Sequence, residues 1–402
     1  MDSSYIQRCG LKMHVSDVHS DLDVSFLEDY YGMGGSDDTV PILTLKAMTD
    51  WMRQIAHWQK NIRGPIIHVG MGGSVLGPKC LAKALGTLRN PNLELVFWSS
   101  PDLRSADVIK ALSNPNSSVI FVSKSMTTHE MLQQKALICK NIPMERCYVV
   151  TANPDRAIEL GFASDHVIAF PSWVSGRFSA WGPTMASVCL AWGQSIIKQW
   201  LEGGVLMERE VIEHQPYWFL SWVKHAMESS VYFIAPYGEA LSELIPYVKQ
   251  IMMESLGKAI NQKDQANDFF QYVMGDVGPD FQHASLQILA EDPRKPVIDI
   301  WVEEDQQSLK ELAFSQALSL HYKQANSKVA LGVLPTLSPK TLGAIMALYE
   351  LKALVLAKQF VLNPFNQPGV EQGKQVLRQC LNSPISLNTF DDWRQWYLDQ
   401  SE

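Results

Sequence analysis

Short apolar runs separated by helical segments dominate this chain from about residue 43 onward. In the first half, we expect strands at 65–71, 93–98, 117–124, 146–153 and 166–170. Helices are expected at 75–88, 105–113, 128–140 and 181–202. Strands that are apolar along their whole length and alternate with helices are typical of a parallel sheet covered on both faces. The first half therefore predicts a doubly wound α/β domain.

The second half of the chain shows the same alternation. We expect helices at 208–228, 239–261 and 308–325, and strands at 231–238, 297–304 and 328–335, with helices from there to the end. Gly203 and Gly204 are expected to end the long helix before them, because glycine is common just past a helix C-terminus. The predicted fold class is α/β, with two doubly wound parallel sheets and helical N- and C-terminal additions. The first predicted domain spans 46–204, and the second spans 205–402 with its C-terminal helices. Residues 1–45 are predicted to form an N-terminal extension that packs on the second domain.

The composition excludes several classes of protein. Apolar residues make up 46% of the 402 residues and charged residues 19%, which excludes a disordered chain. The net charge of −8 argues against a nucleic-acid or anionic-membrane partner. The six cysteines form no C-x-x-C or zinc pattern, and the N-terminus lacks an apolar signal region, so we expect a cytoplasmic protein with reduced thiols. The apolar segment 342–362 carries Glu350, Lys352 and Lys358 and predicts a buried helix rather than a membrane span.

The stretch "PIIHVGMGGSVLGPKCLAKAL", residues 65–85, predicts a strand, a tight glycine turn and a helix. Such a turn directs backbone N–H groups and a helix N-terminus at an anion. Val75 stands where a dinucleotide-binding turn needs its third glycine, and Pro78 stands where a P-loop has its lysine. A nicotinamide dehydrogenase, with Asp102 on a ribose, is therefore disfavoured. Packing of strand on helix without any ligand is the alternative for this turn.

A second candidate for anion binding is "VIFVSKSMTTHEMLQQKAL". Its hydroxyl-bearing residues gather at the positive end of a helix, which suits a compact phosphate monoester: Ser123, Ser125, Thr127 and Thr128. Thr127 and Glu130 have the spacing of a capping box. An ordinary capped helix is the alternative interpretation.

A carboxylate in "YVKQIMMESLGKAI" is a candidate general base. Gln250, Glu254 and Lys258 share one helical face at i, i+4 and i+8, and apolar residues surround the carboxylate. A surface ion pair between Glu254 and Lys258 is the alternative. Arg177, in the glycine-containing turn of "VSGRFSAW", offers a guanidinium to anionic charge.

Two further segments contain candidate polar groups. His283 follows a Gly-Pro turn in "GPDFQHASLQIL", and a hydrogen-bonded packing residue is the alternative for it. In "NPFNQPGVEQGKQVL", Pro368 suits the first position of a helix. Gln367 and Lys374, seven residues apart, share a face of that helix, and a solvated surface lysine is the alternative for Lys374.

Taken together and in this order, six segments resemble the glucose-6-phosphate isomerase family, over about residues 65 to 374. They are "GMGGSVLGP", "SKSMTTHE", "SGRFSAWG", "QIMMESLGK", "QHASLQIL" and "FNQPGVEQGK". The resemblance implies two sugar-isomerase domains and a reversible aldose–ketose shift of glucose 6-phosphate and fructose 6-phosphate through a cis-enediol. It implies no cofactor and no metal. It also implies a homodimer in which His283 reaches the partner's site.

The resemblance assigns roles to residues that match the family's motifs. Glu254 matches the base, and Arg177 matches the group that stabilises the intermediate's negative charge. His283 and Lys374 match the positions tied to ring opening. The substrate-contacting positions, including those for the phosphate, are Gly73, Ser74, Ser123, Lys124, Ser125, Thr128, Gln250 and Gln367.

The chain also departs from the family pattern, with Val75 for aspartate, Ser175 for glycine, Leu256 for asparagine and Pro368 for tryptophan. Two alternatives stay open at this point. A non-catalytic sugar-phosphate sensor would have lost the base or the arginine, whereas Glu254 and Arg177 are both present. An isomerase that also accepts mannose 6-phosphate is compatible with the same residues.

Overall fold

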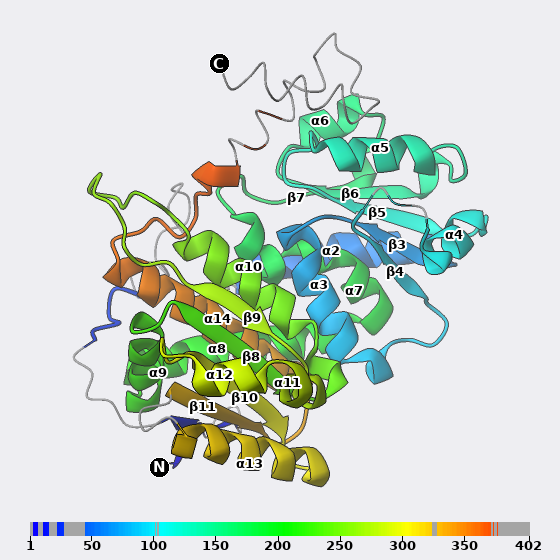
Figure 1. Cartoon of the computed structure of the whole chain (residues 1–402). Coiled ribbons are helices and arrows are strands. Elements are labelled where there is room, and N and C mark those ends of the chain that lie inside the picture. Colours follow the sequence, from blue (N-terminus) through cyan, green and yellow to red (C-terminus); the bar gives the residue numbers. More distant parts are fainter. Residues whose placement is uncertain are drawn as a thin grey trace, which may run out of the picture. The chain divides into compact units, whose positions relative to one another are not determined.

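The computed structural model of the protein describes residues 3–6, 11–15, 22–27, 45–100, 102, 104–323, 328–370, 373 and 376 (Figure 1). The chain forms two compact units, Met1–Phe365 and Asn366–Glu402, and every element named below belongs to the first. In the second unit, residues 368–370, 373 and 376 are helical.

A five-stranded parallel sheet carries the first half of the chain. Its strands are β3 (Ile66–Val69), β4 (Leu95–Trp98), β5 (Ser118–Val122), β6 (Cys147–Thr151) and β7 (Val167–Ala169), in the order β4-β3-β5-β6-β7. The helices of this half are α2 (Leu45–Gln59), α3 (Gly73–Ala84), α4 (Ala106–Ser113), α5 (His129–Ile138), α6 (Pro154–Glu159) and α7 (Ala186–Trp192). The 3-10 helices are η1 (Gly86–Leu88), η2 (Met144–Arg146), η3 (Ser164–His166), η4 (Gly176–Trp181) and η5 (Pro183–Met185).

Helices cover both faces of this sheet, as the apolar strands predict. Ile67 and Val69 of β3 belong to the core cluster that contains buried residues of α4, α5 and α6. Ile66 points to the opposite face and joins a cluster with α2, α3 and α7. Figure 1 shows α5 and α6 on one side of the strands and α3 and α7 on the other.

The strand order reverses at β3, which pairs with β4 on one side and β5 on the other. The chain therefore leaves β3 in one direction and later returns to its opposite side. In open parallel sheets, ligands bind beyond the carboxyl ends of the strands at such a reversal. The glycine turn follows β3 and the Ser123–Thr128 segment follows β5, so the two flank this point.

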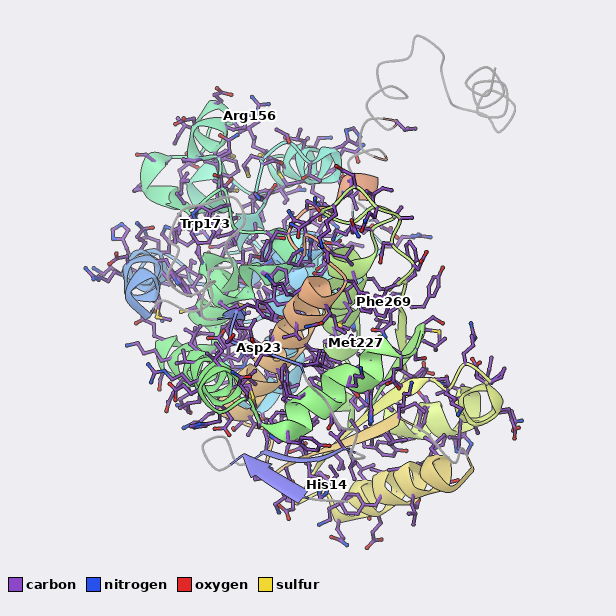
Figure 2. The ribbon with its side chains drawn as sticks, turned by 90° about the vertical axis from the view of Figure 1, so that its left-hand side faces the viewer. His14, Asp23, Arg156, Trp173, Met227 and Phe269 are labelled. Atoms are coloured by element: carbon purple, nitrogen blue, oxygen red, sulfur yellow. The ribbon has the colours of Figure 1, made fainter. Side chains whose placement is uncertain are left out.

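A six-stranded sheet carries the second half and the N-terminus. Its strands are β1 (Ser3–Ile6), β2 (Leu11–Val15), β8 (Val231–Tyr237), β9 (Tyr272–Gly275), β10 (Val297–Glu303) and β11 (Lys328–Leu334), in the order β1-β2-β11-β10-β8-β9. The strands from β8 to β11 are parallel, and β2 pairs antiparallel with β11, where His14 (labelled in Figure 2) lies opposite Leu331. One parallel sheet and one sheet with a parallel core, each packed with helices, confirm the predicted α/β fold class. Strands β1, β2 and β9 were not predicted.

The remaining helices pack around this second sheet. They are α8 (Gln194–His214), α9 (Tyr217–Met227), α10 (Leu244–Leu256), α11 (Gly278–Ala284), α12 (Leu286–Glu291), α13 (Gln307–Lys323) and α14 (Pro339–Gln359), with the 3-10 helix η6 (Glu239–Leu241). Nearly all of α14 is buried, as segment 342–362 predicts. Within the described ranges, none of the helices combines the length and the apolar character needed to cross a membrane.

The expectation that Gly203 and Gly204 end a helix is wrong. Both glycines are buried inside α8, which continues to His214. A Cβ at Gly203 would lie 1.9 Å from the Lys340 carbonyl oxygen, and one at Gly343 would lie 1.9 Å from the Trp200 carbonyl oxygen. The glycines let α8 and α14 approach closely instead of ending α8. The domain boundary placed after residue 204 falls inside this helix and stays a prediction.

Candidate active site

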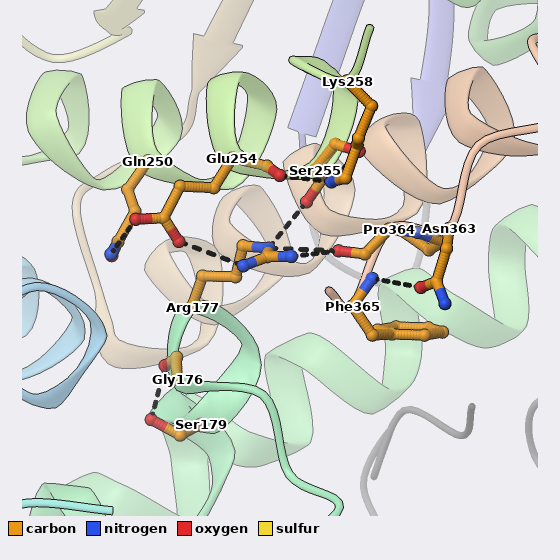
Figure 3. A network of polar contacts seen from close by, with 10 residues as sticks. All are labelled: Gly176, Arg177, Ser179, Gln250, Glu254, Ser255, Lys258, Asn363, Pro364 and Phe365. Carbon is orange, nitrogen blue, oxygen red and sulfur yellow. Dashed lines mark hydrogen bonds and ion pairs between the residues drawn. The ribbon is translucent and has the colours of Figure 1, made fainter. Parts of the chain in front are cut away.

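An ion pair between Arg177 and Glu254 lies at the centre of the site (Figure 3). Arg177 belongs to η4, and Glu254 lies near the C-terminal end of α10. The Arg177 Nη1 donates to Glu254 Oε2 at 3.0 Å. The two residues are 77 positions apart, so folding brings together two groups that the sequence motifs single out separately.

The guanidinium of Arg177 is held from three sides. Its Nε donates to Ser255 Oγ at 3.0 Å and to the Pro364 carbonyl oxygen at 3.1 Å, and Nη2 donates to the same carbonyl. The side chain has 0% of its surface exposed. Burial lowers the pKa of Arg177, and the charge of Glu254 opposes that shift. The guanidinium is thus a rigidly placed cation beside a carboxylate.

The carboxylate of Glu254 is more accessible than its partner. Its side chain is 29% exposed. Gln250, one turn earlier on α10, donates from Nε2 to Glu254 Oε1 at 3.1 Å. One carboxylate oxygen therefore contacts the arginine and the other an amide, and the group still has a solvent-accessible side where a substrate can reach it.

The glycine turn lies directly against these elements. A Cβ at Gly73 would lie 2.1 Å from the Gly176 carbonyl oxygen and 2.6 Å from the Arg177 backbone nitrogen. Only a residue without a side chain lets η4 approach the start of α3 this closely. Gly72 has φ 54°, and a Cβ there would lie 2.9 Å from Gln250 Nε2. The turn thus packs η4 and α10 together, in addition to any contact with substrate.

Lys258 does not form the surface ion pair considered as an alternative. Its ammonium donates to the carbonyl oxygens of Glu254 and Ser255, the latter at 2.7 Å, and the residue is 4% exposed. Burial lowers the pKa of Lys258 to about 7; Arg177 adds to the shift and Glu254 opposes it. Lysine beyond a helix end satisfies carbonyl groups that have no partner within the helix. Lys258 therefore holds the end of α10 that carries Glu254.

The hydroxyl-bearing segment after β5 forms a tight loop. The buried Ser123 accepts the backbone N–H of Met126 at 3.2 Å, and Met126 has φ 56°. Ser125 Oγ accepts from the backbone N–H of Thr127 at 3.2 Å and from its hydroxyl at 2.8 Å. Lys124 and Ser125 are exposed. The loop therefore presents polar groups beside the start of α5.

The predicted capping box between Thr127 and Glu130 is wrong. Helix α5 begins at His129, its N-cap is Thr128, and no side chain caps it. The Thr127 hydroxyl donates to Ser125 instead, because the turn at Met126 places Thr127 before the N-cap. The half-buried Thr128 stands at the helix start with its side chain not used in a cap.

Three further predicted site residues come from later parts of the chain. His283 is exposed on α11, so it is not a buried packing residue. Gln367 lies near the start of the second compact unit, and its carbonyl oxygen accepts the N–H of Val370 at 3.1 Å. Lys374 lies outside the described residues. Within those residues, no group of three or more His, Cys, Asp or Glu could hold a metal ion.

Sequence reasoning missed a buried histidine behind the glycine turn. His68 of β3 is 0% exposed, its Nε2 lies 2.9 Å from the Ser74 carbonyl oxygen and its Nδ1 2.7 Å from Ser187 Oγ. A carbonyl only accepts, so Nε2 carries the proton and Nδ1 accepts from the hydroxyl. His68 ties the half-buried Ser74 to α7. The position of His68 two residues before the first glycine is a signal that could have found it. However, the sequence of an apolar strand does not reveal which polar groups contact its side chains.

Because of His68, we expect stability to fall in mild acid. Burial lowers the pKa of His68 to about 4, so between pH 6.5 and 4 the unfolded chain binds a proton there more readily than the folded one. Stability from this group is complete above pH 6.5 and is lost as the pH falls toward 4. The unfolding temperature of His68→Gln should therefore decrease less steeply over this range than that of wild type. The same change at the exposed His57 is the control, and parallel profiles for wild type and His68→Gln would contradict the assignment.

Comparison with known proteins decides the family. Residues 44–330 and 302–394 match the model of the phosphoglucose isomerase family. The chain belongs to this family. The glucose-6-phosphate isomerase of Burkholderia orbicola is 30% identical over 379 residues, which cover 81% of this chain and 70% of the relative. That of Burkholderia multivorans is 30% identical over 388 residues, covering 83% and 71%.

Solved structures support the phosphoglucose isomerase assignment at the level of the fold. A glucose-6-phosphate isomerase from Chlamydia trachomatis has a TM-score of 0.74 at 21% identity and covers 89% of this chain and 76% of its own. A tagatose-6-phosphate ketose/aldose isomerase from Escherichia coli has a TM-score of 0.53 at 13% identity, covering 80% and 90%. The sugar-isomerase fold expected from the motifs is therefore confirmed. Family membership also confirms the predicted class of activity, an aldose–ketose isomerase.

Proposed function

We propose that this protein interconverts glucose 6-phosphate and fructose 6-phosphate. The observation that carries the proposal is the Arg177–Glu254 pair, 3.0 Å apart, at the glycine turn of a phosphoglucose isomerase chain. Glu254 takes the proton from C2 of the open-chain aldose and returns it to C1. Arg177 stabilises the negative charge that develops on the substrate oxygen in the cis-enediol intermediate. The proton moves within one substrate, so the reaction needs no redox cofactor.

The substrate phosphate is proposed to bind at the loop after β5. Ser123, Lys124, Ser125 and Thr128 supply hydroxyls, a cation and the N-terminus of α5, which together suit a phosphate monoester. The position of this loop beside the glycine turn, at the reversal of strand order, supports one continuous site. Gly73, Ser74 and Gln250 then contact the sugar.

Ring opening is assigned to His283 and Lys374, with Gln367 as a further contact to the sugar. The protein is proposed to act as a cytoplasmic homodimer in which His283 of one subunit completes the partner's site. Exposure of His283 on α11 supports this, because the side chain is accessible to another chain.

A coupled assay on fructose 6-phosphate, with mannose 6-phosphate as a second substrate, tests the proposed reaction. We expect turnover of fructose 6-phosphate to glucose 6-phosphate. Turnover of both substrates would show the broader isomerase that the sequence leaves open. Binding of fructose 6-phosphate in calorimetry without any turnover would show a sugar-phosphate sensor and overturn the proposal.

Ser125→Ala combined with Thr128→Ala should raise KM by about 10-fold or more, because hydrogen bonds to a charged group contribute about 1.5–3 kcal/mol each. The phosphate is bound in both ground and transition states, so kcat should change less than KM. Inorganic phosphate should also inhibit this variant less. Thr87→Ala removes an exposed hydroxyl on η1 and is the control. Unaltered inhibition by phosphate would place its binding site elsewhere.

A further inference from the structure

A buried carboxylate in the middle of α14 has no role in the proposed chemistry. Glu350 is 2% exposed. Its Oε2 accepts from Trp181 Nε1 at 2.7 Å and its Oε1 from the Tyr247 hydroxyl at 2.5 Å. Burying a carboxylate is unfavourable unless hydrogen bonds replace its water contacts, and here both oxygens are bonded.

The two donors belong to the two elements that carry the ion pair. Trp181 is the last residue of η4, four positions after Arg177. Tyr247 lies on α10, seven positions and about two turns before Glu254, and therefore on the same side of that helix. One carboxylate of a third helix thus contacts both η4 and α10.

Other contacts keep this arrangement rigid. The Trp181 ring stacks on Trp200 of α8, with centroids 4.3 Å apart and planes 12° from parallel, which fixes the direction of its N–H. The chain that leaves α14 also reaches the pair, because the Pro364 carbonyl oxygen accepts from Arg177. Figure 3 shows this second connection beside the Arg177 guanidinium. Helix α14, through Glu350, and the segment after it, through Pro364, therefore reach the arginine's surroundings at two separate points.

We infer that Glu350 is a positioning residue that sets the distance between Arg177 and Glu254 by binding η4 and α10 together. This inference rests on the proposed function, because it takes the pair as the reacting groups. Glu350 does not touch the substrate in this role. It holds the base and the cation in a geometry that a small displacement would spoil, and displacements of about 1 Å can lower a rate by about 10²-fold.

The neutral amide is the informative replacement at this position. Burial raises the pKa of Glu350 to about 8, while the bonds from Tyr247 and Trp181 oppose the shift. A glutamine amide can accept from Trp181 through its oxygen and donate to the Tyr247 hydroxyl through its nitrogen. Glu350→Gln should therefore keep both connections, whereas Glu350→Leu removes both at a similar volume.

The first test removes the donors one at a time. Trp181→Phe and Tyr247→Phe should each lower kcat in the fructose 6-phosphate assay by about 10-fold, with KM within about twofold of wild type. The control is Tyr349→Phe. Tyr349 is the neighbour of Glu350 on α14 and equally buried, but its hydroxyl donates to Asp299 of β10 at 2.9 Å. A merely structural role would make all three variants lose stability together and leave kcat unchanged, which would overturn the inference.

The second test compares Glu350→Gln with Glu350→Leu. The amide should recover most of the kcat that the leucine variant loses; equal losses would overturn the inference. Crystal structures of Tyr247→Phe and Tyr349→Phe provide a readout that does not depend on activity. The Arg177 Nη1–Glu254 Oε2 distance of 3.0 Å should lengthen in the first variant and stay in the second. An inactive wild type would overturn the proposed function, whereas an unchanged distance in Tyr247→Phe would overturn the positioning role.

Discussion

Replacing Glu254 by glutamine is expected to lower kcat by about 10²–10⁴-fold, the usual loss when a positioned general base is removed. KM should change little, because the amide has nearly the shape of the carboxylate and the proposed phosphate contacts lie on another element. The fold should survive. Arg177 keeps its bonds to Ser255 and Pro364, and an amide oxygen at position 254 can still accept from Nη1. Steady-state kinetics in both directions, with an unfolding temperature for each variant, measure the effect.

Two further variants are compared with Glu254→Gln, one at an ion pair outside the site and one at the arginine that contacts Glu254. Glu304→Gln also removes a carboxylate paired with a cation, Lys12 at 2.8 Å, but outside the site, and should keep wild-type kinetics. Arg177→Lys should also lose kcat, because an ammonium cannot reproduce the planar fork that contacts Glu254, Ser255 and Pro364 together. A near-normal kcat for Glu254→Gln would remove this residue from the mechanism.

Mixing two inactive variants is expected to restore activity if subunits share their sites. Under the proposed homodimer, each site takes Glu254 from one chain and His283 from the other. Glu254→Gln and His283→Ala dimers should each be nearly inactive. A mixed dimer has one site with both defects and one with neither, and random exchange makes about half of the dimers mixed. About a quarter of all sites should then be intact, and activity should rise toward that fraction as exchange proceeds.

A matched pair tests whether the recovery comes from shared sites. Arg177 and Glu254 contact each other within one chain, so Arg177→Lys and Glu254→Gln belong to the same site. Mixing these two variants leaves one defect in every site of a mixed dimer and should restore nothing. If mass spectrometry confirms exchange and the His283→Ala mixture stays at baseline, His283 acts within its own chain or has no role.

The sequence was most informative where structure is local. Apolar runs such as 117–124 and 146–153 predict β5 and β6, because a strand buried on both faces needs apolar side chains throughout. The long apolar segment 342–362 likewise predicts the buried helix α14. The six ordered motifs also identify the family, because they can be recognised from residue types alone, without knowing which residues contact each other.

Strands β1, β2 and β9 lie toward the edges of the second sheet, where β2 pairs with β11, more than 300 residues later in the chain. They complete a sheet whose central strands lie more than 200 residues from the N-terminus, and their own residues give little local signal. The glycines at 203 and 204 show the same limit. A glycine permits both a helix end and close packing, and the partner that decides between them, Lys340, lies more than 130 residues away.

The candidate site likewise combines residues that the sequence singles out with contacts that only folding brings about. The sequence by itself singled out the side chains that are proposed to carry the chemistry: a carboxylate on one helix, an arginine in one turn and hydroxyls at one helix start. Only the tertiary structure decided that the Glu254 carboxylate pairs with Arg177, while Lys258 binds the Glu254 backbone carbonyl oxygen. The same holds for Pro364, 187 residues from Arg177, whose carbonyl oxygen accepts from the guanidinium. The physical reason is that a buried charge is stabilised by whichever groups the packing of η4, α10 and α14 brings within hydrogen-bond distance, and sequence spacing does not contain those distances.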